Sequence, residues 1–462
     1  MANISFGTDG FRGILGKDFN PENIKIIVKS CAKYILETYG AEKKIIIGYD
    51  PRNKAEEYAR QTAQLLLNFG FDVCVSKKII PTPMIAFGAK YYNACAFMLT
   101  ASHNPPEYLG IKFIPDFGGP ATSDITNKIT KYFDNNHFSS DRKGKIIDLD
   151  LEKPYFEHIK TLINIEKIKK VKSNIIFDGL YSSTIGYFDK FLEENEIRFE
   201  KINCYHDINF GGGMPDPKPK YLKTLIEKIK EKTNSVGLAN DGDGDRYGVI
   251  NEKGEYVTPN EIMGILLLHL IKNKNAQGDL AITVAGSSML KILAQKLNVK
   301  IIETPVGFKW LGEAMRKNNV ILAGEDSGGL SIGSHIPEKD GIIANLLILE
   351  AMGYEEKSLT ELQNKLHSFV GTTFKQDRLD YKFENKEEML SVIDKISKIN
   401  DFPCKITEIN KTDGLKICFD NNSWILVRPS GTEPLLRVYF ESQPQNLNEL
   451  KVFVDNKIKS FL

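Results

Sequence analysis

Apolar and polar positions follow one another in regular blocks along this chain, and the blocks predict alternating helices and strands. Residues 23–39 carry apolar side chains at helical spacing, and residues 44–48 form a short apolar run typical of a buried strand. A second helix and strand are predicted over 55–69 and 71–76. This succession is typical of parallel βα units, so we expect an α/β fold.

The same succession returns further along the chain. The pattern predicts a strand over 174–177, a helix over 259–273 and strands over 280–284 and 299–303. It changes to a smaller α+β segment from about residue 371, and 462 residues are too many for one hydrophobic core. We therefore predict three related α/β domains and a smaller C-terminal α+β domain, with boundaries at 1–150, 151–255, 256–370 and 371–462.

Four short apolar runs end in loops rich in polar residues. The run 96–99 precedes TASHNPPEY, 236–239 precedes NDGDGDR, 320–323 precedes GEDSGG and 424–427 precedes RPSGTEP. Open α/β sheets bind ligands at the carboxyl ends of their strands. Together these loops supply a serine, a carboxylate cluster, a hydroxyl-binding loop and an arginine-led anion nest, a combination hard to reach by chance.

Ser102 is the candidate reactive group in the first of these loops. Ser102 and His103 could form a nucleophile pair, but adjacent residues on a tight loop project differently and a base normally reaches its serine from elsewhere. A plain turn is the competing interpretation, since Ser, His, Asn and Pro are all loop formers. Lys112 follows about ten residues later and could return to the same site, although a single lysine is typically a solvated surface charge.

The second loop places three aspartates, Asp241, Asp243 and Asp245, at alternating positions. They can converge hard oxygens on one cation, which suits Mg²⁺ or Ca²⁺. An EF-hand loop is the competing interpretation, because Glu252 falls at its twelfth position; however, Arg246 occupies the sixth, where that turn requires Gly, and no helical pattern leads in. An arginine beside three aspartates fits an anion that bridges metal and guanidinium.

Two further strand ends carry polar groups. GEDSGG offers Glu325 and Ser327 to hydroxyl groups, and its paired glycines let a ligand approach the backbone. TPVGFKW follows another predicted strand and contributes Thr304, Gly307 and Lys309. Acidic loops are often only turns, but a position directly after a buried strand favours a binding role.

The last loop and the first residues of the chain complete the candidate set. In RPSGTEP, Arg428, Ser430, Gly431 and Thr432 can form a phosphate cradle from a guanidinium fork, hydroxyls and backbone N–H groups, with a bare turn as the alternative. FGTDGFRG opens the chain and places Arg12 among glycines, a composition suited either to tight bending near a ligand or to a flexible terminal turn.

Composition narrows the class of partner. The net charge of +1 gives no field that would attract nucleic acid or an anionic membrane. Six scattered cysteines without a CxxC pair favour a reduced, cytoplasmic compartment, and neither a signal pattern nor a membrane-spanning stretch is apparent. We therefore expect small-molecule partners.

Taken together and in this order, the motifs resemble those of the α-D-phosphohexomutase superfamily along essentially the whole chain. TASHNP resembles the phosphoserine loop, DGDGDR the metal loop, GEDSGG the sugar loop and RPSGTEP the phosphate loop, and FGTDGFRG also matches. The resemblance implies four domains around a central cleft. It also implies reversible phosphoryl transfer between the two ends of a sugar monophosphate.

By that resemblance Ser102 carries the phosphoryl group, and one Mg²⁺ per chain is held by the three aspartates and a phosphate oxygen on Ser102. A hexose 1,6-bisphosphate serves as primer and intermediate. Lys112 and Arg12 become the proton-transfer and phosphate-stabilising groups, and His103 is a supporting contact. The implied contacts to the sugar phosphate are Arg246, Thr304, Gly307, Lys309, Glu325, Ser327, Arg428, Ser430, Gly431 and Thr432.

The choice of sugar follows from smaller differences. TPVGFKW resembles the loop of glucose-handling mutases, and GEDSGG differs from the GEQSG pattern associated with phosphoglucosamine mutases. Glucose phosphate is therefore favoured as the substrate, and mannose phosphate is also compatible. We expect the protein to be a monomer or a homodimer. A phosphoglucosamine mutase and a non-catalytic metal-binding regulatory protein are the alternatives. Leu109 is a departure, because relatives commonly have Asn at this position before Gly-Ile-Lys.

Overall fold

The computed structural model describes residues 10–134, 142–430 and 434–461. Its three N-terminal domains share one sheet topology, which confirms the predicted relationship between them. In each, a central strand pairs in parallel with one strand on either side, and a further strand pairs antiparallel with one of these two neighbours. The candidate serine, carboxylate and sugar loops each connect that neighbour to the antiparallel strand.

The first domain has sheet order β1-β5-β4-β2-β3. Its strands are β1 (Phe11–Ile14), β2 (Ile45–Tyr49), β3 (Val73–Val75), β4 (Cys95–Leu99) and β5 (Tyr108–Ile114), and its helices are α1 (Pro21–Tyr39), α2 (Ala55–Asn68), α3 (Thr82–Tyr91) and α4 (Ser123–Thr130). The Asn20 side chain accepts from the Asn23 N–H and so caps α1, which begins with a proline. Strand β3 is shorter than predicted, because the Phe71 N–H still donates to Leu66 at the end of α2.

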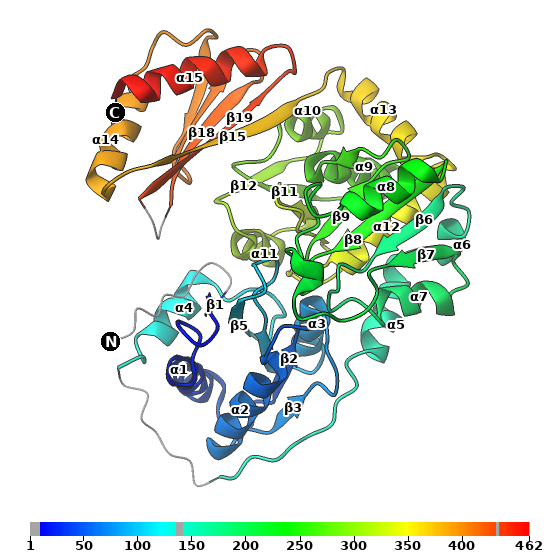
Figure 1. Ribbon diagram of the computed structural model, residues 1–462, viewed down its shortest axis with the longest axis vertical. Helices are drawn as coiled ribbons and strands as arrows, with labels where there is room; N and C mark the ends of the chain where they lie inside the picture. The colour runs from blue at the N-terminus through cyan, green and yellow to red at the C-terminus, as the bar shows by residue number, and fades with distance from the viewer. Residues whose placement is uncertain (1–9, 135–141, 431–433, 462) are drawn as a thin grey trace.

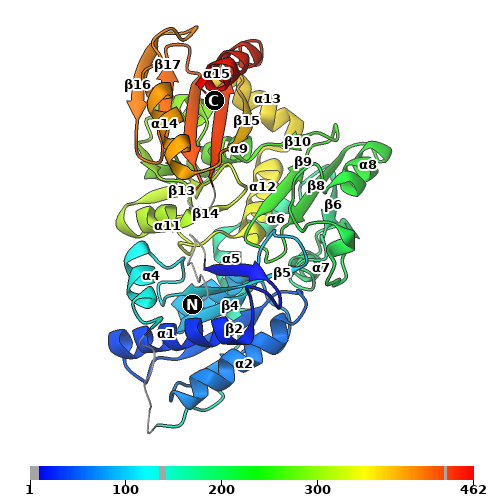
Figure 2. The same ribbon diagram turned by 60° about the vertical axis from the view of Figure 1, so that its left-hand side comes forward.

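The alternation of side chains along these strands separates two cores. Ile45, Ile47 and Phe97 face α1 and α2, whereas Ile46 and Met98 face α3. The views in Figures 1 and 2 show α1 and α2 together on the outer face of this sheet. The inner face continues into the core of the next two domains, so the sheet that carries Ser102 is fixed from both sides.

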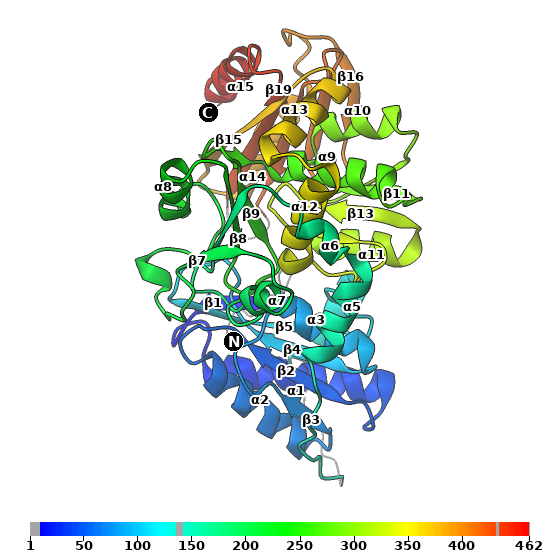
Figure 3. The same cartoon turned by 90° about the vertical axis from the view of Figure 1, so that its right-hand side faces the viewer.

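The second domain has sheet order β10-β9-β8-β6-β7. Its strands are β6 (Asn174–Asp178), β7 (Phe199–Ile202), β8 (Ser235–Asn240), β9 (Tyr247–Ile250) and β10 (Tyr256–Val257), and its helices are α5 (Lys153–Leu162), α6 (Ile165–Ile168), α7 (Phe188–Glu194), η1 (Phe210–Gly212) and α8 (Lys223–Glu231). Helix α5 lies beside α3 of the first domain, as Figure 3 shows.

The third domain has sheet order β12-β11-β13-β14. Its strands are β11 (Asp279–Thr283), β12 (Ile301–Thr304), β13 (Val320–Gly324) and β14 (Leu330–Ile332), and its helices are α9 (Pro259–Lys272), α10 (Ser288–Lys296), α11 (Phe308–Lys317), α12 (Gly341–Glu355) and α13 (Leu359–Val370). Thr258 with Glu261 and Ser358 with Glu361 form capping boxes that start α9 and α13. Helix α12 is largely apolar all round, as expected of a helix buried between the second and third sheets.

The C-terminal domain is an antiparallel sheet of order β15-β19-β18-β17-β16. Its strands are β15 (Lys375–Lys382), β16 (Ile406–Asn410), β17 (Leu415–Phe419), β18 (Trp424–Pro429) and β19 (Leu435–Ser442), packed on α14 (Lys386–Ser397) and α15 (Leu447–Phe461). This domain lies at the opposite end of the molecule from the first one (Figure 1). Across the described ranges, the structure contains no helix that is both long and apolar enough to span a bilayer.

Candidate functional site

Ser102 lies directly beyond β4, in a backbone conformation that serine rarely adopts. Its φ of 52° is left-handed, a conformation that costs a non-glycine residue about 1 kcal/mol or more. The side chain is 1% exposed, and its Oγ donates a 2.8 Å hydrogen bond to Oδ2 of Asp241. The first and second domains therefore meet at this serine.

His103 does not act on Ser102 as a base in this geometry. Its Nδ1 lies 3.4 Å from the Ser102 Oγ, while the serine proton is directed to Asp241. Burial lowers the pKa of His103 to about 2, and the cations of Arg246 and Arg12 contribute. The arrangement disfavours a Ser–His nucleophile pair and leaves His103 as a neutral neighbour of the serine.

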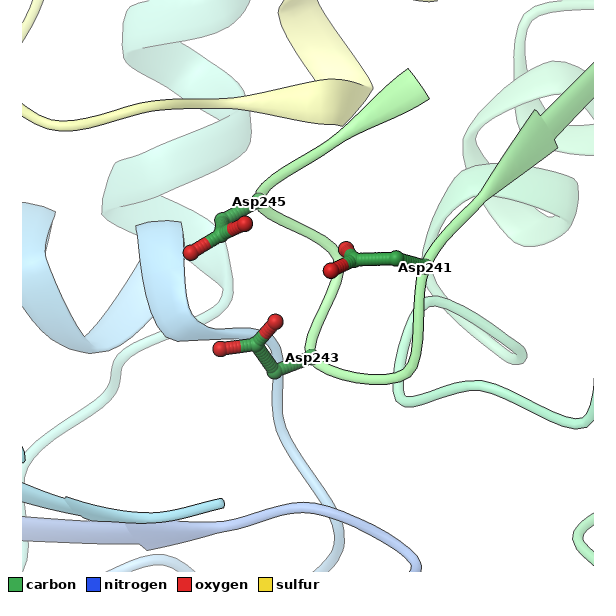
Figure 4. A group of neighbouring side chains, drawn as sticks. All are labelled: Asp241, Asp243 and Asp245. Carbon is green, nitrogen blue, oxygen red and sulfur yellow. The ribbon is translucent and has the colours of Figure 1, made fainter. Parts of the chain in front are cut away.

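Asp241, Asp243 and Asp245 converge as the sequence predicts. Their carboxylates are fully buried, point toward one another in Figure 4, and offer ligand oxygens within 4.8 Å of one another. Oδ1 of Asp245 is buried without a hydrogen-bond partner among the described residues. Burial and the two neighbouring carboxylates raise the pKa of Asp241 well above its usual range. Three hard oxygens held together in this way fit a divalent cation such as Mg²⁺.

The EF-hand interpretation of this loop is excluded by its surroundings. Strand β8 leads into the loop and β9 leads out, where an EF-hand requires helices. Glu252 points elsewhere: it accepts hydrogen bonds from the N–H groups of Leu359 and Thr360 at the start of α13. It therefore caps a helix in the third domain.

Two lysines neutralise the aspartates. Lys112 is 2% exposed, and its Nζ lies 2.9 Å from Oδ2 of both Asp243 and Asp245, so the surface interpretation of this lysine is wrong. Lys339, which the sequence reasoning missed, lies 3.2 Å from Asp245. Burial and the neighbouring Asp243 carboxylate raise the pKa of Asp245, but the two lysines and Arg246 outweigh them, so this pKa is lowered. The only sequence signal for Lys339 is its place in the polar EKD segment before α12.

Leu109 does not disturb Lys112. Both residues lie on β5, three positions apart, so their side chains project from opposite faces of the sheet. Leu109 is fully buried with Ile111 and Phe113 in the core under α1. The departure from the common pattern therefore falls on the core face of the strand.

Thr82 is a second residue that the sequence reasoning missed. At the start of α3, its hydroxyl donates to Oδ2 of Asp243 at 2.7 Å, and its N–H donates to the Asp243 carbonyl at 2.8 Å. The side chain is fully buried. Because the Thr82 hydroxyl and N–H both donate to Asp243, the first domain helps to orient the carboxylate cluster of the second.

Two arginines border the serine and the aspartates. Nη1 of Arg12, on β1, donates to the side chain of Asn104 in the serine loop at 3.1 Å. The Arg246 N–H donates to Oδ1 of Asp241 at 3.0 Å, and its backbone pairs with Gly329 at the end of the sugar loop. The carboxylate and sugar loops are therefore joined through their backbones.

The third domain brings together Glu325, Ser327 and Gly307. Oε1 of Glu325 accepts from the Gly307 N–H at 3.1 Å, and the Ser327 hydroxyl lies 3.4 Å from the other oxygen. Burial raises the pKa of Glu325. The Thr304 hydroxyl donates to the carbonyl of the next residue, Pro305, at 3.0 Å, and Lys309 donates to Ser123 of the first domain at 3.1 Å.

The fourth domain contributes Arg428 at the end of β18. Its Nε donates to Oδ2 of Asp413 at 2.8 Å, and the same oxygen accepts from the Val306 N–H in the third domain at 2.9 Å. The Ser430 N–H donates to Leu435 across the base of the loop at 2.7 Å. The other two predicted phosphate ligands, Gly431 and Thr432, lie outside the described residues.

Comparison with known proteins assigns the three repeated α/β domains and the fourth domain to the phosphohexomutase class. The chain matches the phosphoglucomutase/phosphomannomutase α/β/α domain I over residues 3–140, domain II over 153–254, domain III over 258–369 and the C-terminal domain over 381–457. It belongs to this family of isomerase-type phosphotransferases.

Individual relatives cover nearly the whole chain. A phosphoglucomutase/phosphomannomutase of Thermococcus kodakarensis is 30% identical over 95% of both chains. A phosphoglucosamine mutase of Clostridioides difficile is 29% identical over 99% of both. A solved structure assigned as a phosphomannomutase from Thermus thermophilus matches with a TM-score of 0.86 and 28% identity, covering 98% of this chain and 99% of the other. Relatives with different named sugars are thus about equally similar.

Proposed function

We propose that this enzyme moves a phosphoryl group between the 1- and 6-positions of a hexose phosphate through a phosphorylated Ser102. The observation that carries the proposal is the 2.8 Å hydrogen bond from the Ser102 Oγ to Asp241. It places a buried nucleophilic oxygen directly against a carboxylate cluster suited to a cation. Phosphoryl transfer depends mainly on positioning and charge neutralisation, which this arrangement supplies.

The aspartates Asp241, Asp243 and Asp245 would hold one Mg²⁺ together with an oxygen of the phosphoryl group on Ser102. The cation supplies charge neutralisation for a group that carries nearly two negative charges. Lys112, now against two of these carboxylates, supplies further positive charge. Arg12 supports the serine loop from β1 and would stabilise the phosphoryl oxygens.

Each half-reaction exchanges one bond to phosphorus for another. In the first, a free sugar hydroxyl bonds to phosphorus, the Ser102 Oγ–P bond breaks, and the hydroxyl proton passes through Lys112 to the serine oxygen. The product is a hexose 1,6-bisphosphate. The bisphosphate then reorients in the site, the Ser102 Oγ attacks its other phosphate, and the steps of the first half-reaction run in reverse. One serine therefore serves both positions of the sugar. A trace of bisphosphate primes the enzyme because it phosphorylates Ser102.

The sugar and its second phosphate need contacts that work in both orientations. Glu325 and Ser327 would hold sugar hydroxyls, and Arg428 with Ser430 would anchor the phosphate that does not react, because an arginine fork fits phosphate oxygens. The remaining proposed contacts to the sugar phosphate are Arg246, Thr304, Gly307, Lys309, Gly431 and Thr432, and His103 would be a supporting contact beside Ser102.

Glucose phosphate is the proposed sugar, supported by the TPVGFKW and GEDSGG loops, and mannose phosphate is compatible with them. Phosphoglucosamine is the second candidate, because several relatives of 28–30% identity are named phosphoglucosamine mutases. These relatives make the choice of sugar a question of relative kcat/KM.

Phosphorus NMR of the protein with Mg²⁺, glucose 1-phosphate and a trace of glucose 1,6-bisphosphate tests the proposal. We expect glucose 6-phosphate to appear with the intact protein and no conversion with Ser102→Ala. Conversion by the serine variant would contradict the phosphoserine mechanism.

Mannose 1-phosphate and glucosamine 1-phosphate, offered separately and then in competition, decide the sugar. A higher kcat/KM for the amino sugar would replace glucose by the second candidate. No conversion of any of the three would contradict the proposed reaction.

A further inference from the structure

Arg52 lies behind the serine loop and holds it by its backbone. It follows β2, the strand that pairs with β4, and is 3% exposed. Its Nη2 donates to the carbonyls of Ser102 and Asn104, both at 2.6 Å, and its Nη1 donates to those of Pro105 at 2.7 Å and Tyr108 at 3.1 Å. One guanidinium thus joins four carbonyl oxygens of the serine loop and of the first residue of β5, three of them in partly buried residues.

Asp50 fixes the guanidinium from the other side. Its Oδ2 lies 3.2 Å from the Arg52 Nε and accepts the Thr100 hydroxyl at 2.5 Å, while its Oδ1 accepts the Arg52 N–H at 3.0 Å. Phe210, from the second domain, covers the guanidinium at 4.9 Å. Arg52 therefore has a fixed position, which is set by Asp50 in the same domain and by Phe210 in the second domain.

The same residues hold the backbone of the strained serine on both sides. The Ser102 N–H donates to the Thr100 hydroxyl at 2.8 Å, and the Ser102 carbonyl accepts from Arg52. Both backbone polar groups of Ser102 are thus held while its φ is left-handed. A strained conformation persists when its surroundings over-determine it, and here the determining groups are Thr100, Asp50 and Arg52.

We propose that Arg52, oriented by Asp50, is a positioning residue that keeps Ser102 aimed at the carboxylate cluster for phosphoryl transfer. This inference rests on the proposed function. Lysine cannot replace the guanidinium, because a single ammonium with three donors cannot serve four carbonyls in a planar fork. Arg52 would act on the position of Ser102 and not on binding of the second phosphate, because the proposed anchor for that phosphate, Arg428, lies in another domain.

The test compares the unaltered protein, Arg52→Lys and Asp50→Asn with Arg60→Met. Arg60 is an exposed arginine on α2 paired with Glu56, and it serves as the matched control. Each protein is mixed with Mg²⁺ and glucose 1,6-bisphosphate, and serine phosphorylation is followed by intact mass in a single-turnover experiment. KM for glucose 1-phosphate and thermal unfolding are measured on the same samples.

We expect Arg52→Lys to slow phosphorylation about 100-fold, the order of loss that a misplacement near 1 Å produces. Asp50→Asn is expected to slow it about tenfold, with KM within about twofold of the unaltered protein in both. The control should match the unaltered protein. Phosphorylation at the normal rate in the folded Arg52→Lys protein would overturn the inference, as would a rate that falls only in proportion to the unfolded fraction.

The result with the unaltered protein distinguishes failure of the positioning role from failure of the proposed function. If it is phosphorylated and Arg52→Lys is phosphorylated equally fast, the positioning role fails and the proposed function stands. If the unaltered protein takes up no phosphoryl group from glucose, mannose or glucosamine bisphosphate, both fail. If Arg52→Lys does not fold, Asp50→Asn decides, because it keeps one oxygen for Thr100 while removing the charge that orients Arg52.

Discussion

The Thr82 hydroxyl donates a 2.7 Å hydrogen bond to Oδ2 of Asp243, joining the first turn of α3 to the carboxylate loop of the second domain. Thr82→Val keeps the shape of the side chain and removes this donor. Partners of metal ligands typically change affinity 10- to 100-fold, so we expect at least a tenfold weaker affinity for Mg²⁺ by titration calorimetry. Thr82→Ser, which keeps the hydroxyl, should bind Mg²⁺ nearly as the unaltered protein does. Equal affinity in Thr82→Val would show that the contact does not orient Asp243.

Asp413 joins the fourth domain to the third, because one of its oxygens accepts from both Arg428 and Val306. Asp413→Asn removes the charge that orients the guanidinium. A charge-assisted hydrogen bond contributes about 1.5–3 kcal/mol, so we expect KM for the hexose phosphate to rise about tenfold or more in steady-state assays.

Serine phosphorylation by a saturating bisphosphate should change little in Asp413→Asn. The control is Asp380→Asn, which breaks an exposed pair with Arg378 in the same domain. A fall in kcat with an unchanged KM in Asp413→Asn would argue against an anchoring role for Arg428.

His158 should make folding sensitive to mild acid. Burial lowers its pKa to about 4, and the adjacent His335, 3.1 Å away, contributes. Between pH 6.5 and 4 the unfolded chain binds a proton at this site that the native protein does not, so the free energy of unfolding falls as pH falls through this range. The ring is only half-buried, so we expect about 1 kcal/mol between pH 7.5 and 5 after allowance for solvent screening.

Urea unfolding of the unaltered protein and His158→Gln at pH 7.5 and 5 measures this contribution. Glutamine keeps a donor near His335 but does not titrate. The variant should lose about 1 kcal/mol less on acidification than the unaltered protein. Identical losses would assign the acid sensitivity to other groups.

The sequence predicts the strand ends well because they depend on local patterns. A short apolar run followed by polar residues marks Ser102, Asp241 and Glu325 at equivalent points of three related sheets. Thr82 and Lys339 could not be found in this way, since their roles arise from contacts between domains. The buried position of Lys112 could not be predicted for the same reason, because its two carboxylate partners lie in another domain.

Lys416 tests how the fourth domain is attached. It is 1% exposed on β17, its Nζ donates to the Val284 carbonyl of the third domain at 2.6 Å, and it lies 4.5 Å from the Trp424 ring. Lys416→Met fills a similar volume but leaves the buried carbonyl without its partner, which costs about 1–3 kcal/mol. Denaturant unfolding should show this loss, whereas Lys398→Met, at an exposed pair with Asp394, should change stability by less than about 0.5 kcal/mol.

Lys416→Met should also separate two functions of the fold. The carboxylate cluster is built from the first three domains, so Mg²⁺ affinity should be unchanged. The proposed phosphate anchor at Arg428 lies on β18, which pairs with the strand that carries Lys416, so KM for the hexose phosphate should rise. A joint loss of Mg²⁺ affinity and substrate affinity would instead show that docking of the fourth domain shapes the whole site, including the side of the molecule that holds Ser102.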